Sequence, residues 1–305
     1  MAFLPSEAPP PRRRALVYTA LGCALVGAAL FLVVRTAGRE RQTAPRCPPG
    51  LVAVETRCCG AGQTLVSSHC SGTPTSCAAG MHAIAGVRGG CVVNERRVSF
   101  TGGVLTIAHS DWEPRAEVQP RAVRIGPFEI DAHEVTLDRW QRCVTAGGCR
   151  SQPLTEPGQP VASVTPAEAL QFCRFFGGRL PTADEWLFAA AGPKSRRFPW
   201  GETGLVCRRV VFGLAEGPCA DGAGTPEVVG SRPDGRTPEG LFDMAGNVAE
   251  WTLEAPSKQS RGRPEFAARG GSYRSKVATE LKSWSLEMTD RPAPHIGFRC
   301  AYSSE

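Results

Sequence analysis

The run GLFDMAGNVAEW, at residues 240–251, combines oxygen donors, glycines and apolar residues at short spacings. Such a run is typical of a bent loop that holds a ligand. Asp243 and Glu250 can each offer a carboxylate, and the backbone near Gly246 and Val248 can turn its carbonyl groups toward the same point. These donors suit a hard cation that collects six to eight oxygen atoms, and calcium is the natural candidate.

The same run also allows a purely structural interpretation. Gly246 and Asn247 can form a tight turn, because both residue types are favoured in turns. Asp243 and Glu250 would then accept hydrogen bonds from backbone amides, while the large apolar residues fill the core. These apolar residues are Phe242, Met244 and Trp251. The spacing alone leaves both interpretations open.

Three further groups of short motifs accompany this run in a fixed order. They are FEID (128–131) with EVT (134–136); GGRLPT (177–182) with EW (185–186) and AAAG (189–192); and RGGSY (269–273) with GFRC (297–300). Together the four blocks resemble the signature of the sulfatase-modifying-factor family, which includes the formylglycine-generating enzymes and many bacterial relatives. The resemblance implies a compact, loop-rich α+β fold, similar to that of C-type lectins, over residues 98–305. A fold does not by itself settle the chemistry.

The composition argues against a nucleic-acid-binding protein. The chain has 305 residues, of which 42% are hydrophobic, so it can bury a substantial core. Its formal charge is +6, but residues 1–46 hold seven arginines and two glutamates, which leaves only +1 for the rest. A nearly neutral globular part lacks the basic surface that nucleic acids require.

The N-terminal region predicts one membrane-spanning helix. Residues 15–34 carry no charge and follow three arginines, and 20 apolar residues can cross the hydrocarbon layer. We therefore expect a tail at 1–14, a transmembrane helix at 15–34 and a polar linker at 35–46. The alternatives are a cleaved signal peptide, for which no cleavage site is evident, and a lipoprotein site at Cys23.

The cysteines predict on which side of the membrane the protein lies. Twelve of the 13 cysteines follow the apolar segment, many at short hairpin-like spacings. Disulfides persist in oxidising compartments, so we expect a cytoplasmic N-terminus and an extracytoplasmic bulk, periplasmic or extracellular. Zinc is the alternative use of paired cysteines, but the chain contains no C-x-x-C motif.

Residues 47–97 form a predicted cysteine-rich module. A C-x-x-G unit, a short apolar stretch and a closing cysteine occur three times, which indicates three small hairpins, each closed by its own disulfide. Six cysteines allow fifteen pairings, and the repeat favours one of them. The favoured pairs are Cys47–Cys58, Cys59–Cys70 and Cys77–Cys91. We interpret this module as a spacer or contact surface.

Local signals also predict helices and disulfides in the family-like region. Thr165 with Glu168, and Thr182 with Glu185, form capping boxes at the starts of two helices, and Thr136 precedes a third. Residues 192–240 are rich in glycine and proline, so we expect irregular structure there. Two local disulfides are expected from spacing, Cys143–Cys149 and Cys207–Cys219.

The family resemblance implies further assignments. The family cysteines that match Cys173 and Cys300 are bonded to each other. The ligands of one family calcium ion match the side chains of Asp243 and Glu250 and the carbonyl groups of Gly246 and Val248, which leads us to predict one structural calcium. A second family calcium site would fall near residues 210–211, where Val210 replaces a side-chain amide. We do not expect that second site.

The copper chemistry of the family is not expected here. The formylglycine-generating enzymes bind copper through two cysteines that follow the Gly-Gly-Ser motif, and thiolates suit a soft cuprous ion. The matching positions are Ser275 and Glu280, and no cysteine occurs between Cys219 and Cys300. Ser272 of the motif is retained, whereas Ala249 replaces an aromatic residue before the signature glutamate.

Iron is not expected either, because no two histidines share a metal-binding spacing. The five histidines are His69, His82, His109, His133 and His295. His133 is expected to be structural, while His295 is placed near the rim of the expected pocket. Other candidate pocket groups are Trp200, Tyr273, Arg274 and Trp284.

The sequence therefore predicts a membrane-anchored, extracytoplasmic domain that binds a protein, peptide or glycan without forming formylglycine. Two enzyme classes remain as alternatives: a formylglycine-generating-type oxidase, or a non-haem iron oxygenase, with a rearranged metal site.

Overall fold

The computed structural model describes most of the chain beyond the N-terminal region. The described residues are 47, 51–55, 57–66, 69–77, 80–84, 90–107, 121–153, 156, 158–204, 206–220, 224–255 and 265–304. The predicted tail, transmembrane helix and linker at 1–46 lie outside them. Among the described residues, no helix is both long and apolar enough to cross a membrane. Residues 44–305 belong to one compact unit.

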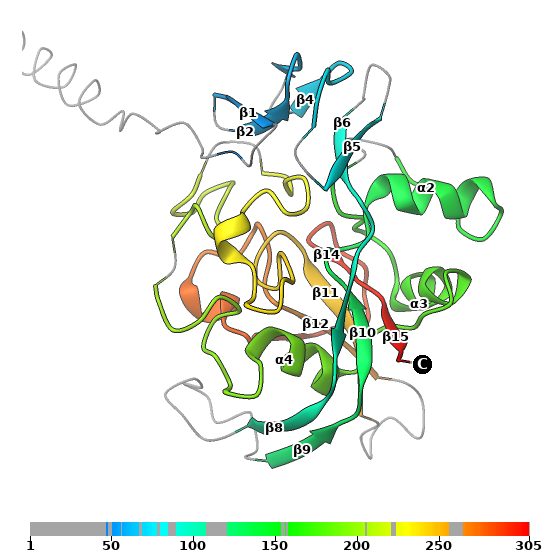
Figure 1. Ribbon diagram of the computed structural model, residues 1–305, viewed down its shortest axis with the longest axis vertical. Helices are drawn as coiled ribbons and strands as arrows, with labels where there is room; N and C mark the ends of the chain where they lie inside the picture. Colours follow the sequence, from blue (N-terminus) through cyan, green and yellow to red (C-terminus); the bar gives the residue numbers. More distant parts are fainter. Residues whose placement is uncertain are drawn as a thin grey trace, which may run out of the picture. The chain divides into compact units, whose positions relative to one another are not determined.

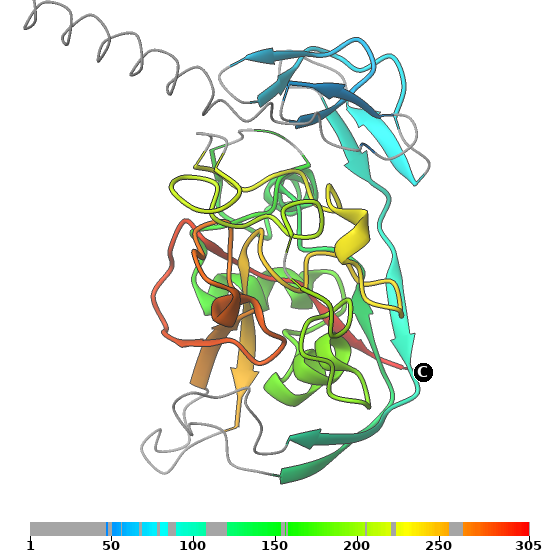
Figure 2. The same ribbon diagram turned by 90° about the vertical axis from the view of Figure 1, so that its left-hand side faces the viewer.

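Three antiparallel hairpins make up the cysteine-rich segment, as the repeat predicts (Figure 1). Their strands are β1 (Leu51–Val54) with β2 (Arg57–Gly60), β3 (Thr64–Val66) with β4 (His69–Ser71), and β5 (Met81–Ile84) with β6 (Gly90–Val93). An extended segment leads from β6 into the following strand, β7 (Arg97–Phe100) (Figure 2).

The disulfides of this segment follow the favoured pairing, with one difference in their role. Cys59–Cys70 and Cys77–Cys91 are both bonded. Cys59 lies in β2 and Cys70 in β4, so this bond joins the first hairpin to the second instead of closing only one hairpin. Cys47 is also in a disulfide. The side chain of Cys58 lies outside the described part of the chain, so its pairing with Cys47 stays a prediction.

Two sheets and one further hairpin form the strands of the larger region. The first sheet has the order β15-β10-β7, and the second has the order β13-β12-β11-β14, in which β11 and β14 are parallel. A separate hairpin joins β8 (Gly103–Ile107) and β9 (Arg121–Ile125). The remaining bounds are β10 (Phe128–Asp131), β11 (Ala249–Glu254), β12 (Glu265–Arg269), β13 (Leu286–Met288), β14 (Ile296–Gly297) and β15 (Ala301–Ser303).

In the described part of the chain, three helices lie against these sheets, and their starts follow the sequence signals. They are α2 (Leu137–Thr145), α3 (Pro166–Phe175) and α4 (Ala183–Ala191). Both capping boxes form, because Thr165 and Thr182 accept bonds from the amides of Glu168 and Glu185. Thr136 is the N-cap of α2, but its side chain makes no capping bond. α4 contacts β8, β9 and β11 (Figure 1).

The core is tied together by one long-range disulfide. Cys173 of α3 is bonded to Cys300, which lies 127 residues further along the chain, as the resemblance implies. Local disulfides Cys143–Cys149 and Cys207–Cys219 are also present. Within the described part of residues 192–240, the only helical element is the short 3-10 turn η1 (Pro233–Gly235). That irregular region reaches the start of the diagnostic run at residues 240–251.

Candidate functional site

The Gly270-Gly271-Ser272 turn fixes the geometry of the candidate site. It follows directly on β12, and Gly271 has a positive φ of 66°. A Cβ atom at Gly271 would lie 2.2 Å from the carbonyl oxygen of Glu280 and 2.9 Å from Oγ of Ser275. Only glycine therefore allows the turn to approach both residues this closely. The two positions that match the family's copper cysteines are thus brought to one place.

Hydrogen bonds within the turn hold its serines in place. The amide of Ser272 donates to Oγ of Ser275 at 3.0 Å, and the amide of Ser275 donates to the carbonyl oxygen of Ser272 at 3.0 Å. Oγ of Ser272 accepts from the amide of Arg274 at 3.2 Å. Each hydroxyl group acts here as an acceptor, so its own proton can be donated to a ligand.

A pocket of about 340 Å³ opens beside this turn, and we call it the Ser272 pocket. It brings together the four residues that the sequence associates with the family's catalytic position, Ser272, Ser275, Glu280 and His295. The other lining residues are Ala249, Ala268, Gly271, Arg274, Ser285, Leu286 and Glu287. Of the aromatic candidates, Tyr273 is buried in a separate cluster, and Trp200 and Trp284 pack against core clusters. None of these three lines the pocket.

The polar groups of the Ser272 pocket are hydroxyl, carboxylate, imidazole and guanidinium groups. Nε2 of His295 lies 3.1 Å from Oε2 of Glu287. Oε2 of Glu280 accepts from the amide of Lys276 at 2.8 Å. Every cysteine whose side chain is described is in a disulfide, so none offers a thiolate here. In the described ranges, no three His, Cys, Asp or Glu side chains converge in a metal-binding group.

The diagnostic run at 240–251 forms a bent loop, as its composition predicts. Asp243, Gly246 and Asn247 all have positive φ angles, between 55° and 80°. Met244 and Trp251 are buried, in agreement with the structural interpretation. Oδ2 of Asp243 accepts from the amide of Gly230 at 2.6 Å. Burial raises the pKa of Asp243 to about 6.

The predicted calcium site is not confirmed, because both oxygen atoms of Glu250 already accept hydrogen bonds. Its Oε2 accepts from Nε of Arg299 at 2.7 Å and from Nε1 of Trp186 at 2.8 Å. Its Oε1 accepts from Nη2 of Arg299 at 2.7 Å. A calcium ion would require these oxygen atoms as ligands. These hydrogen bonds compete with the predicted ligands, so the site at Asp243, Gly246, Val248 and Glu250 stays unconfirmed, and Arg299 supplies the positive charge beside Glu250.

A third carboxylate, that of Glu134, lies close to those of Asp243 and Glu250. No role in the site was assigned to it from the sequence. It accepts from the amide of Val248 at 3.0 Å and from Nδ2 of Asn247 at 2.7 Å. Burial raises the pKa of Glu134 well above its usual value, and the charges of Asp243 and Glu250 raise it further. Glu134 therefore fastens the β10–α2 corner to the diagnostic run.

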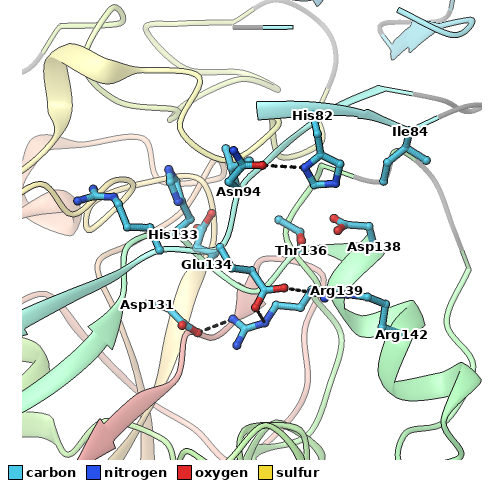
Figure 3. Close-up of a pocket in the computed structure, with 13 residues that line it drawn as sticks. His82, Ile84, Asn94, Asp131, His133, Glu134, Thr136, Asp138, Arg139 and Arg142 are labelled. Carbon is cyan, nitrogen blue, oxygen red and sulfur yellow. Dashed lines mark hydrogen bonds and ion pairs between the residues drawn. The ribbon is translucent and has the colours of Figure 1, made fainter. Parts of the chain in front are cut away.

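A second pocket, of about 320 Å³, lies between the β5–β6 hairpin and the start of α2 (Figure 3). Oδ1 of Asp138 is buried there and has no hydrogen-bond partner among the described residues. Burial raises the pKa of Asp138. Nδ1 of His82, in β5, lies 2.9 Å from Oδ1 of Asn94, which directly follows β6. No sequence motif joins these residues, because they come from separate modules.

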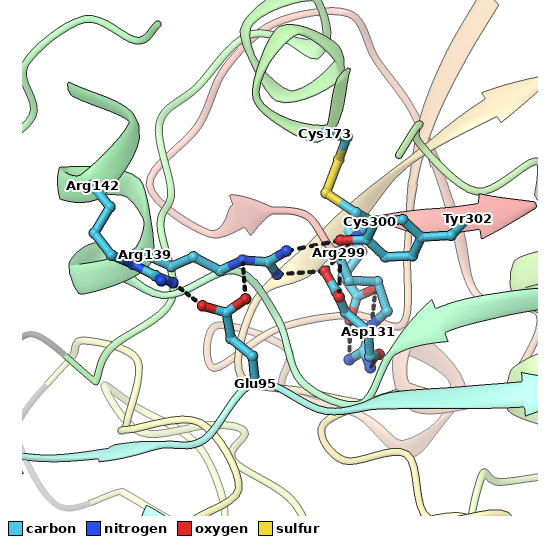
Figure 4. Close-up of polar contacts among 9 residues, drawn as sticks. Glu95, Asp131, Arg139, Arg142, Cys173, Arg299, Cys300 and Tyr302 are labelled. Carbon is cyan, nitrogen blue, oxygen red and sulfur yellow. Dashed lines mark hydrogen bonds and ion pairs between the residues drawn. A yellow bond between two sulfur atoms is a disulfide. The ribbon is translucent and has the colours of Figure 1, made fainter. Parts of the chain in front are cut away.

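Several residues that line this second pocket belong to a network of charged groups (Figure 4). Arg139 donates to Asp131 at 2.6 Å and to the hydroxyl of Tyr302 at 2.8 Å. Glu95 pairs with Arg139 and Arg142. These contacts join the end of the hairpin module to α2, so the network is a structural connection.

The loop-rich α+β fold and the pocket at the Gly-Gly-Ser turn define a domain of the formylglycine-generating-enzyme type. The family model described as the sulfatase-modifying factor enzyme 1-like domain matches residues 89–304, and the chain belongs to this family.

Relatives of this chain include both active and inactive proteins. It is 32% identical over 186 residues to the formylglycine-generating enzyme of Streptomyces coelicolor, covering 52% of this chain and 57% of that one. It is also 32% identical over 161 residues to the inactive C-alpha-formylglycine-generating enzyme 2 of Mus musculus, covering 48% and 49%. The chain thus matches about half the length of these two relatives. PvdO from Pseudomonas aeruginosa shares the fold, with a TM-score of 0.53, 21% identity and coverage of 68% and 94%.

Proposed function

We propose that this chain is a membrane-anchored, extracytoplasmic member of the family that binds a protein, peptide or glycan and does not form formylglycine. One observation carries the proposal. The Ser272 pocket persists at about 340 Å³, yet Ser275 and Glu280 stand where the copper enzymes have cysteines.

The donor chemistry of the pocket supports a binding role. A cuprous ion prefers soft thiolate ligands, whereas hydroxyl and carboxylate groups are hard donors. The same groups are well suited to hydrogen bonding with a polar ligand, and concave sites commonly combine a small apolar floor with a few such groups. Ala249 and Ala268 supply that floor here. The existence of an inactive relative shows that the family contains members without the activity.

The anchoring and location rest on the sequence. Residues 15–34 are uncharged, and the disulfides of the larger region require an oxidising compartment. Extraction of membranes with alkaline carbonate tests the anchor, because an integral protein stays with the lipid. Recovery of the whole chain in the supernatant would contradict the proposed span.

A second candidate, an iron-dependent oxygenase or a rearranged oxidase, is favoured by one observation. His295, Glu280 and Glu287 line the same pocket, and imidazole and carboxylate are the two ligand types of the non-haem iron(II) triad, although that triad uses two histidines and this pocket has one. Glu280 is already bonded to backbone amides and Glu287 to His295, so both would have to change partners. We therefore rank this candidate second.

One experiment separates the candidates. The purified full chain in detergent is incubated with copper, oxygen, a thiol reductant and a cysteine-containing sulfatase-type peptide, and mass spectrometry follows conversion of the thiol to an aldehyde. The Streptomyces coelicolor enzyme in the same buffer is the positive control. We expect no aldehyde from this chain. Turnover would overturn the binding proposal, and turnover with iron in place of copper would favour the second candidate.

A matched variant tests whether the two replaced positions account for the lost chemistry. Ser275→Cys with Glu280→Cys restores both thiols at the Gly-Gly-Ser turn. We expect this double variant to bind cuprous ion in a spectroscopic titration, whereas the parent chain does not. Equal copper binding by both proteins would show that other groups control the site.

A further inference from the structure

Strand β13 is an open edge of the four-stranded sheet. Its three residues pair with β12 on one side, with Ala268 opposite Glu287. On the other side, β13 pairs with no strand in the described part of the chain. All three of its residues are exposed. An exposed edge presents unpaired backbone N–H and C=O groups, which are a template for pairing with another chain.

The two faces of this edge differ in chemistry. Side chains alternate along a strand, so Leu286 and Met288 lie on one face and Glu287 on the other. Leu286 is 44% exposed and Met288 is 63% exposed, whereas proteins usually protect an edge with charges or proline. Two apolar side chains on one face of an open edge offer a partner strand an apolar contact.

The edge is continuous with the Ser272 pocket. Leu286 and Glu287 both line that pocket, so a segment lying along β13 reaches its rim. The side chain of Glu287 is 50% exposed and pairs with His295, and Glu280 is a second carboxylate in the same pocket. Arg274 also lines the pocket, but its Nε donates to the hydroxyl of Tyr273 at 3.1 Å and its guanidinium lies 5.4 Å from that ring. The carboxylates on the side of β13 therefore favour a basic side chain.

We propose that β13 and the Ser272 pocket together bind an extended segment of a partner protein by strand addition, with basic residues facing Glu287 and apolar residues facing Leu286 and Met288. The inference rests on the proposed binding function and names its partner class. In this mode the main-chain hydrogen bonds provide affinity, and the alternate side chains provide specificity.

The test uses short peptides of alternating lysine and valine and the full chain in detergent, with binding followed by fluorescence anisotropy. Two N-methylated forms are compared, one methylated on the lysine amides and one on the valine amides. Because alternate residues of a strand point their N–H groups to opposite edges, each form blocks one edge. We expect one form to lose affinity by at least about tenfold and the other to keep it. Equal effects of the two forms would overturn strand addition.

Variants of the protein locate the contact. Glu287→Lys should weaken binding by about tenfold, whereas Glu129→Lys makes the same charge change on the separate β10 sheet and should not. Met288→Lys should also weaken binding, and Val104→Lys on β8 is its control, because Val104 is likewise exposed, at 46%. Equal binding by all four variants would contradict the inference.

Failure of this inference can be told apart from failure of the binding function. Ser285→Trp places a large side chain in the Ser272 pocket and leaves the three residues of β13 themselves unsubstituted. Suppose that Ser285→Trp abolishes binding of the lysine–valine peptide, while the β13 substitutions and N-methylation of the peptide leave its affinity unchanged. The pocket then binds the peptide, and strand addition is wrong. Absence of any peptide binding would also overturn the inference and leave a glycan ligand for the pocket.

Discussion

Arg299 and Glu250 form a two-fold hydrogen-bonded ion pair in the core, with Nε and Nη2 of the arginine each 2.7 Å from one carboxylate oxygen. The two side chains are 0% and 1% exposed. Arg299 also donates to the carbonyl groups of Asp131 and Phe242. The pair therefore joins the carboxyl-terminal segment to β10, β11 and the diagnostic run.

The first prediction concerns this pair. Arg299→Met leaves Glu250 buried without its partner, and we expect the free energy of unfolding to fall by about 3–5 kcal/mol. Urea unfolding measures the change. Arg208→Met is the control, because Arg208 and Asp234 form an exposed pair at 3.2 Å, and its loss should cost about 0–1 kcal/mol. Equal effects of the two substitutions would show that burial does not govern the Arg299 pair.

The second prediction concerns calcium. Both oxygen atoms of Glu250 accept N–H donors, so we expect the melting temperature to be the same in calcium and in EDTA. Differential scanning calorimetry of the full chain checks this. A rise in melting temperature with calcium that is lost in Glu250→Ala would instead support the site predicted at Asp243, Gly246, Val248 and Glu250.

Local signals predicted more of the fold than of the site. The capping boxes at Thr165 and Thr182 act within one helical turn, so a short stretch of sequence determines both helix starts. By contrast, Glu250 meets Arg299 across 49 residues, and Glu134 meets Asn247 across 113. Spacing along the chain could not reveal that Arg299 occupies the oxygen atoms assigned to calcium.

The Ser272 pocket was predicted in part. The family resemblance located Ser275 and Glu280, and the structure brings both to the Gly271 turn. The edge strand β13 was missed, because three exposed residues show no alternation strong enough to be recognised in sequence. The second pocket was missed for another reason: its walls come from two modules, and only folding brings them together.

The third prediction concerns the dependence of stability on pH. Burial, and then the charges of Arg299 and Arg96, lower the pKa of His133 to about 3. The unfolded chain has the ordinary value of about 6.5, so below that pH it binds a proton that the folded chain does not. This contribution to stability is present above about pH 6.5 and is lost on acidification, by about 2–3 kcal/mol at two units below.

His133→Phe tests this assignment while it retains an aromatic ring against Phe242, whose centroid lies 4.6 Å from that of His133. We expect the variant to show a flatter loss of stability than the parent chain from neutral pH down to about pH 4.5, measured by urea unfolding at each pH. Parallel curves for the two proteins would assign the acid sensitivity to other groups.

The fourth prediction concerns the Gly271 turn. Gly271→Ala would bring Cβ to 2.2 Å from the carbonyl oxygen of Glu280, so the turn must open. We expect destabilisation of about 1–3 kcal/mol and loss of ligand binding at the Ser272 pocket. Gly126→Ala is the control, because a Cβ atom there meets nothing within 4 Å. Normal binding by Gly271→Ala would show that the close approach is not needed.

The junction of Cys173 with Cys300 has a consequence for biosynthesis. Strand β15 (Ala301–Ser303) pairs with β10 (Phe128–Asp131), and Cys300 stands directly before it, so one short segment supplies both the sulfur and the strand. While residues 128–175 emerge from the ribosome, β15, the partner of β10, and Cys300, the partner of Cys173, have not yet been synthesised. Contacts this distant in sequence form late, because the loop between them must close first. The domain must therefore wait, with β10 unpaired on its β15 side, until synthesis passes residue 303.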